Sequence, residues 1–307
     1  MKTAYVQTLI ELADRDERVF VVEADLSVAS GTLAFREKFP KRYVDVGVAE
    51  ANMVGIAAGL AAEGMIPFCC SFTPFASRRV YDQITVSVAY ANLNVKIVGM
   101  APGFTTLLNG GTHMCFQDMA IMRAMPNMVV LSPADSQELA ACMHWMAETE
   151  SPAYLQLIRQ EQKPLFPPSY RFDPGKAVRL HDGADVTVLS TGYMTKFALQ
   201  AAEILSGEGV QVDLLHCPCV KPFPFSDVLE SVQRTKCAVT VENQSIIGGL
   251  GGATAEALSE HYPVPIKRMG IPDQFGEVVA EESYILEKYR FGTTHIAATC
   301  RELASGK

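Results

Sequence analysis

The sequence predicts an α/β protein of two domains, each a three-layer α/β/α arrangement around a mainly parallel sheet. Short β-rich runs alternate with longer helical patterns in both halves of the chain, and a proline-rich segment separates the halves. With 307 residues, 49% of them hydrophobic, the chain is long enough for two cores. Alternating strands and helices favour parallel strands that are covered by helices on both faces.

In the first half, runs rich in β-branched and aromatic residues are expected to form strands. These runs are residues 19–22, 43–46, 67–70, 95–98, 129–131 and 153–157. Apolar residues at helical spacing predict helices over residues 51–63, 74–91 and 135–148. We place the first domain at residues 1–160.

A linker is expected at residues 161–182, because Pro164, Pro167 and Pro168 are followed by Pro174 and Gly175. Proline fixes φ and removes a backbone donor, so this segment is expected to be extended. The alternation then resumes, with strands expected at 186–190, 210–215 and 238–241 and helices at 196–205 and 252–261. The second domain is placed at residues 183–307.

Composition and charge exclude several classes of protein. The 26 Lys and Arg residues against 34 Asp and Glu residues give a net charge of −8, which argues against a nucleic-acid binder with a broad basic face. The uncharged stretches 64–77 and 97–117 are interrupted by Pro, Gly, Asn or His, so no membrane span is expected. No secretory signal is visible, and the eight cysteines form no CxxC frame. We therefore expect a cytoplasmic protein with reduced, buried thiols.

The segment DVGVAEANM places Glu50 at the start of a strongly apolar helix. A carboxylate at a helix N-terminus is favoured by the helix dipole, so a purely structural role is the simpler interpretation. However, the helix continues with Met53, Val54 and Ile56, and its start follows a strand, where open α/β sheets bind ligands. A carboxyl group in such apolar surroundings can exchange protons near neutral pH.

Three further features are candidates for a binding site, two of them beside other expected strand ends. Phe72 and Phe75, in SFTPFASRR, are three residues apart and could form one face for a flat heterocycle, although aromatic residues are usually core residues. His113 ends the segment NGGTH, whose two glycines let the backbone come close to a ligand, although a loop histidine is most often only solvated. Arg159 follows the strand at 153–157 and could either bind an anion or lie on the surface.

Taken together and in this order, DVGVAEANMVGIAAGLA, SFTPFASRRVYDQI, GGTH and IRQ resemble the pyrimidine-binding half of transketolases. The later segments VEN, GGLG and GIPD are similar to the C-terminal domain of that family. The resemblance implies an enzyme dependent on thiamine diphosphate, which moves a two-carbon ketol unit from a ketose to an aldose.

The same resemblance implies roles for particular residues. The family glutamate that matches Glu50 bonds N1′ of the cofactor's aminopyrimidine and exchanges its proton, while Phe75 and Phe72 form the aromatic wall. Asp25 matches an acidic residue near the cofactor, and His113 is the second catalytic residue, bonding a donor hydroxyl. The substrate-binding residues are then His113, Asn109, Arg159, Lys2 and Ser30.

The chain departs from the family pattern at its sugar-binding positions. A phosphate-binding His falls on Ala101, a hydroxyl-reading Asp on Asn109, an Arg on Lys2, and a Ser on Ala29 or Ser30. We therefore expect a donor or acceptor other than the standard pentose phosphates, such as a branched sugar phosphate, a sulfonated sugar or an unphosphorylated ketose.

The Gly-Asp-Gly motif with which the family holds the diphosphate and its metal does not occur in the sequence. We expect a C-terminal subunit of a split transketolase, without metal ligands of its own. An N-terminal subunit would hold the diphosphate and a divalent metal, Mg or Ca, in an assembly with two copies of each chain. Two alternatives stay open: the β subunit of a 2-oxoacid dehydrogenase E1 component, and a non-catalytic assembly subunit.

Overall fold

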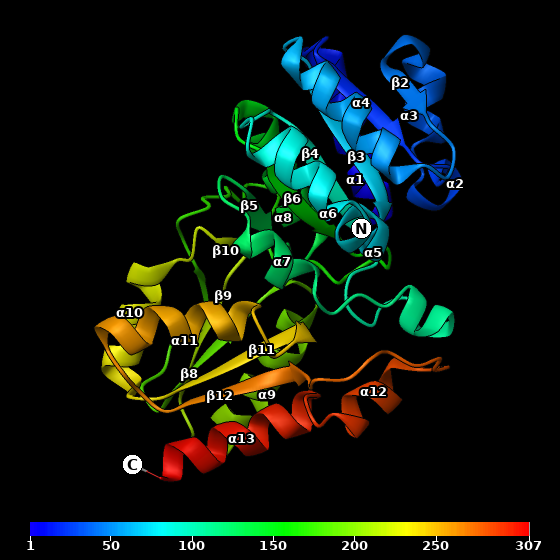
Figure 1. The fold of residues 1–307 in the computed structure, drawn as a ribbon. Coiled ribbons are helices and arrows are strands. Elements are labelled where there is room, and N and C mark those ends of the chain that lie inside the picture. Colours follow the sequence, from blue (N-terminus) through cyan, green and yellow to red (C-terminus); the bar gives the residue numbers. More distant parts are fainter. Residues whose placement is uncertain (307) are drawn as a thin grey trace.

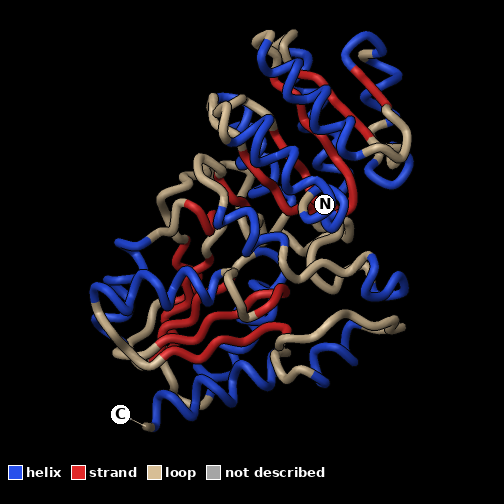
Figure 2. The backbone as a smooth tube through the Cα atoms, in the orientation of Figure 1, coloured by secondary structure: helices blue, strands red, loops and turns tan. Residues whose placement is uncertain are grey.

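The computed structural model describes residues 1–306, which form two α/β domains with helices packed around each sheet (Figures 1 and 2). The first sheet has seven strands in the order β10-β5-β6-β4-β3-β1-β2, and the second has five in the order β12-β11-β8-β9-β7. Every pairing is parallel except β10 with β5 and β7 with β9. The predicted α/β class with mainly parallel sheets is confirmed.

The first domain contains six strands from the first half of the chain and the helices around them. The strands are β1 (Val19–Glu23), β2 (Tyr43–Asp45), β3 (Ile66–Phe72), β4 (Lys96–Met100), β5 (Val129–Leu131) and β6 (Ala153–Leu157). The helices are α1 (Lys2–Arg15), α2 (Ser27–Ser30), α3 (Leu33–Lys38), α4 (Glu50–Ala62), α5 (Thr73–Ala76), α6 (Tyr81–Gln83), α7 (Asp118–Ala124) and α8 (Ser136–Glu148). All six predicted strands are present.

The core of this domain lies on both faces of the sheet. All residues of β4 and β6 are buried, as expected for strands with helices on each side. Successive side chains of a strand point to opposite faces. Ile97 accordingly belongs to the cluster beneath α4, whereas Val98 belongs to the cluster beneath α1 and α8.

The single helix that we predicted over residues 74–91 is wrong. The chain leaves helical geometry at Ser77 (φ −128°, ψ −88°), where the Ser77 hydroxyl donates to the carbonyl of Thr73. Beyond this break, a 3₁₀ turn (Arg78–Val80) leads into α6 and a π-helical segment (Ile84–Ala89). A local bond from serine to the backbone competes with helical hydrogen bonding here.

The second domain is built in the same way from the later part of the chain. Its strands are β7 (Val178–His181), β8 (Val186–Ser190), β9 (Val212–His216), β11 (Ala238–Ser245) and β12 (Ile266–Ile271). Its helices are α9 (Thr195–Gly207), α10 (Phe225–Thr235), α11 (Leu250–His261), α12 (Glu282–Lys288) and α13 (Thr293–Ser305). β7 lies inside the segment predicted as a linker, and β10 (Cys219–Lys221) returns to pair with the first sheet. The boundaries at 160 and 183 stay a prediction.

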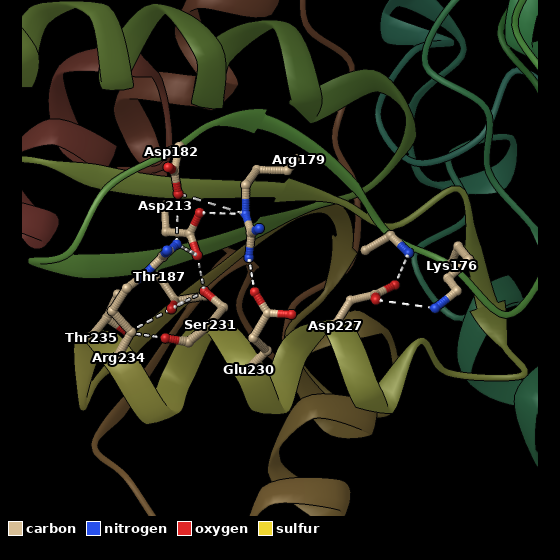
Figure 3. A network of polar contacts seen from close by, with 11 residues as sticks. Lys176, Arg179, Asp182, Thr187, Asp213, Asp227, Glu230, Ser231, Arg234 and Thr235 are labelled. Carbon is tan, nitrogen blue, oxygen red and sulfur yellow. Dashed lines mark hydrogen bonds and ion pairs between the residues drawn. The ribbon is translucent and has the colours of Figure 1, made fainter.

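A polar network holds α10 against the second sheet (Figure 3). Buried Asp213 on β9 accepts bonds from Arg179 Nε at 3.0 Å and Ser231 Oγ at 2.5 Å, and it pairs with Arg234 at 2.7 Å. The Thr187 hydroxyl, on β8, lies 2.6 Å from the Ser231 hydroxyl. The buried charge of Asp213 is thus balanced by two arginines, as a stable buried carboxylate requires.

The structure bears on two further expectations, one about the cysteines and one about membrane spans. The eight cysteines are buried and free, as predicted: Cys69, Cys70, Cys115, Cys142, Cys217, Cys219, Cys237 and Cys300. Within residues 1–306, every helix is too short or too polar to cross a membrane.

Candidate active site

The predicted site residues follow different strands of the first sheet. Asp25 follows β1, Glu50 follows β2, Phe72 ends β3, and Arg159 follows β6. Strands β1, β2, β3, β4 and β6 run parallel, so their carboxyl ends reach the same edge of the sheet. Ligands of open α/β sheets bind beyond this edge.

Glu50 is the first residue of α4, and its side chain is only 5% exposed. Arg79 Nη1 donates to Glu50 Oε1 at 2.8 Å, and no hydrogen bond joins Oε2 to another residue between 1 and 306. The sequence suggested apolar surroundings for Glu50, but the structure also places a charged arginine beside its carboxylate. Met53 and Val54 on the same helix are buried in the core, while a guanidinium approaches the carboxylate from the other side.

Asp45 connects the two turns that carry Asp25 and Glu50. Its Oδ1 accepts bonds from the backbone amides of Asp25 and Gly47, both at 3.0 Å. Gly47 (φ 72°) turns the chain toward α4, and Asp25 (φ 58°) has the left-handed backbone that aspartate tolerates better than most residues. The β1–α2 and β2–α4 connections are thereby held together.

Phe72, Phe75 and His113 form an aromatic cluster at this edge. The ring centroids of Phe72 and Phe75 are 6.4 Å apart, and that of His113 lies 5.8 Å from Phe72 and 5.2 Å from Phe75. All three pairs are edge-to-face, a favoured aromatic geometry. The guanidinium carbon of Arg79 lies 3.8 Å from the ring centroid of Phe75 and joins this cluster to Glu50.

The loop that carries His113 is held from both sides. Thr112 Oγ1 is 2.9 Å from His113 Nδ1, and no hydrogen bond links Nε2 to any other part of the chain that the structure describes. A Cβ at Gly111 would lie 2.4 Å from the carbonyl oxygen of Gly276, so this glycine lets the second domain approach. In Figure 1 the loop and the segment before α12 lie side by side, and Val279 N donates to Leu107 O at 3.3 Å.

Of the other predicted substrate residues, the structure brings only Arg159 into contact with this cluster. Arg159 is exposed, with its guanidinium carbon 6.0 Å from the ring centroid of Phe72. Asn109 is exposed in the 3₁₀ segment Leu107–Thr112. Lys2 lies over Gly31 at the end of α2, where a Cβ would be 3.5 Å from Lys2 Cε. Ser30 is fully buried, and its hydroxyl donates to Glu23 Oε1 at 2.7 Å.

Two charged residues of this region were not predicted. Arg79 lies in the 3₁₀ turn beyond the break at Ser77, and this break brings its guanidinium over the ring of Phe75. Glu23 is fully buried at the end of β1, accepts hydroxyl bonds from Ser30 and Thr32 at 2.7 Å each, and has its pKa raised to about 7 by burial. The sequence could have indicated Glu23 only through its place two residues before the predicted site residue Asp25.

The donor groups at this edge match one half of thiamine diphosphate. A carboxylate at a helix start and a flat aromatic face suit a hydrogen-bonding heterocycle such as an aminopyrimidine. Among the 306 described residues, no group of three or more His, Cys, Asp or Glu side chains could hold a metal ion. The side chains at this edge therefore fit the pyrimidine end of the cofactor.

Comparisons with known proteins agree with this assignment. Residues 1–164 match the transketolase pyrimidine-binding domain family, and residues 175–296 match the transketolase C-terminal domain family. The chain is 47% identical, over all of its length and 95% of the relative's, to the 6-deoxy-6-sulfo-D-fructose transketolase subunit SqwH of Clostridium sp. (strain MSTE9). It is 32% identical, over 89% of its length and 88% of the relative's, to a subunit of the apulose-4-phosphate transketolase of Phocaeicola vulgatus.

A solved structure shares the complete fold. This structure, described as a split gene transketolase in an inactive beta4 tetramer, aligns with a TM-score of 0.90 at 37% identity. The alignment covers 99% of this chain and 97% of that one.

Proposed function

Because the chain belongs to the transketolase family, as the C-terminal subunit of a split enzyme, we propose that it forms the pyrimidine half of a shared active site. The observation that carries this proposal is a chain of contacts at one sheet edge: Arg79 joins Glu50 to Phe75, and the ring of Phe75 contacts His113. In this site the chain takes part in moving a two-carbon ketol unit from a ketose to an aldose.

Glu50 is proposed to bond the aminopyrimidine and to hold and release the proton at N1′. Its nearly buried side chain keeps water away, and Oε2 is available to a ligand, since no described residue bonds it. When bound, thiamine diphosphate supplies the carbon centre that accepts and donates the two-carbon unit. Phe72 and Phe75 would orient the ring, and Asp25 would stand beside the cofactor on a turn that Asp45 connects to the Glu50 turn.

His113 is proposed to bond a hydroxyl of the donor sugar. Thr112 engages Nδ1, which orients the ring and leaves Nε2 for the substrate. The rest of the substrate would contact Asn109, Arg159, Lys2 and Ser30. For this role the Ser30 hydroxyl would have to exchange its bond to Glu23 for one to the substrate.

For the donor we propose a sulfonated ketose, such as 6-deoxy-6-sulfo-D-fructose. A sulfonate carries one negative charge, whereas a phosphate monoester carries about −1.5 to −2 at pH 7. A pocket with Ala101 and Lys2 at two anion-binding positions offers fewer directional donors, because lysine lacks the planar fork of arginine. The 47% identity to a 6-deoxy-6-sulfo-D-fructose transketolase subunit supports this choice.

The partner is proposed to be an N-terminal transketolase subunit. It would hold the diphosphate and a divalent metal, Mg or Ca, and the assembly would contain two copies of each chain. A 2-oxoacid dehydrogenase β subunit is not supported, because the full-length relatives compared above are transketolase subunits. A purely assembling role is likewise disfavoured by the retained Glu50 and His113 geometry.

The substrate proposal is tested by reconstituting the two chains with thiamine diphosphate and Mg²⁺. The kcat/KM for 6-deoxy-6-sulfo-D-fructose is compared with those for xylulose 5-phosphate and apulose 4-phosphate, with one aldose phosphate as the common acceptor. We expect the sulfonated ketose to have the highest value. A highest value for xylulose 5-phosphate would contradict the argument from Ala101, Asn109 and Lys2.

A further inference from the structure

Arg79 contacts both groups that are proposed to receive the pyrimidine ring. Its Nη1 donates to Glu50 Oε1 at 2.8 Å, and its guanidinium carbon lies 3.8 Å from the ring centroid of Phe75. The Arg79 side chain is 46% exposed, whereas that of Glu50 is 5% exposed. One flat cation therefore bridges a nearly buried carboxylate and an aromatic face while remaining in contact with solvent.

A guanidinium and an aminopyrimidine protonated at N1′ present similar chemistry to this site. Both are flat, both donate an in-plane N–H bond to a carboxylate, and both stack on aromatic rings. A heterocycle that bonds Glu50 and stacks on the same face of Phe75 would need the space that the Arg79 guanidinium fills. The two groups cannot occupy it together.

On the basis of the proposed function, we propose that Arg79 closes the pyrimidine site of the ligand-free chain and swings into solvent when the cofactor enters. The guanidinium keeps the Glu50 carboxylate paired in the meantime, since an unpaired charge at a nearly buried position is costly. The neighbouring Arg78 is engaged elsewhere, because its Nη2 donates to Thr112 O at 3.1 Å. Arg79 thus occupies the position of the pyrimidine ring until the cofactor enters, and this competition lowers the affinity for the cofactor.

Removing this side chain is expected to strengthen cofactor binding. When a site is open for only part of the time, its apparent Kd is the intrinsic Kd divided by the open fraction. A partly exposed ion pair with a stacked guanidinium corresponds to an open fraction on the order of 10–30%. In the reconstituted complex with Mg²⁺, Arg79→Ala should lower the Kd for thiamine diphosphate roughly three- to tenfold, measured by titration calorimetry, and Arg79→Lys should give a value in between.

Arg15→Ala is the matched control, because it removes another arginine–glutamate pair, with Glu11 at 2.5 Å, on the remote helix α1. Its Kd should equal that of the unmodified complex. Thermal unfolding checks that each variant is folded. If the unmodified complex binds the cofactor and Arg79→Ala binds it equally or more weakly, the inference about Arg79 is wrong. If the unmodified complex binds no thiamine diphosphate, the proposed function itself fails.

Discussion

The two oxygens of the Glu50 carboxyl group have different surroundings, and this difference yields a prediction at the scale of one residue. Oε1 accepts from Arg79 in the structure, whereas Oε2 has no bond from a described residue and is proposed to hold the N1′ proton once Arg79 has made way for the cofactor. Glu50→Gln keeps the shape of the side chain but cannot exchange that proton. We expect kcat for ketol transfer by the reconstituted enzyme to fall by about 10²–10⁴-fold, as for the loss of a general acid–base step.

The matched control for this substitution is Glu63→Gln. Glu63 is exposed at the C-terminal end of the same helix, so its replacement removes a charge without touching the site. Far-ultraviolet circular dichroism should show an unchanged fold for both variants. Glu50→Gln activity within a few-fold of the unmodified enzyme would exclude Glu50 from the proton transfer.

At the scale of elements, the connection from β1 to α3 depends on the buried carboxyl of Glu23. Ser30 and Thr32 both donate to Oε1, and Oε2 is buried without a hydrogen bond in the described chain. Burial raises the pKa of Glu23 from 4.5 to about 7, so the folded state favours the protonated form. Below pH 4.5 Glu23 is protonated in both the folded and the unfolded chain, and the protein has its full stability. As the pH rises from 4.5 to 7, the unfolded chain loses this proton more readily than the folded chain, so the free energy of unfolding falls by about 3 kcal/mol.

Glu23→Gln should remove this pH dependence, because an amide stays neutral and its oxygen can still accept from both hydroxyls. We expect similar free energies of unfolding for the two proteins at pH 5, and a more stable variant at pH 8. Urea unfolding at several pH values measures the difference. A difference that does not change between pH 5 and pH 8 would show that Glu23 does not titrate in this range.

At the scale of the whole molecule, the chain is proposed to supply the pyrimidine end of the site, and no metal cluster is found among its described residues. We therefore expect the isolated chain to bind thiamine diphosphate weakly, and the complex with the N-terminal subunit to bind it tightly with Mg²⁺ or Ca²⁺. Equilibrium dialysis measures the binding, and light scattering after size exclusion should give two copies of each chain. Tight, metal-dependent binding by the isolated chain would contradict the shared site.

The sequence by itself determined the α/β class, the strands of the first domain and the candidates Glu50, Phe72, Phe75 and His113. Buried parallel strands are continuous apolar runs, and Glu50, Phe72 and Phe75 follow or end expected strands, so local pattern and parallel topology place these three at one edge. His113 was a candidate only through its glycine-rich loop and the family resemblance. Neighbouring residues specify these features, so they can be predicted without knowing the long-range contacts.

Only the tertiary structure decided which groups these candidates contact. The Arg79–Glu50 pair depends on packing between segments that are distant in sequence, and the bond from Ser30 to Glu23 depends on how the chain folds back over the end of β1. The same holds for Gly111, which is needed because residue 276 of the second domain approaches it, and for β10, which returns to the first sheet. Such contacts are set by three-dimensional packing and hydrogen-bond satisfaction, which no local pattern of residues encodes.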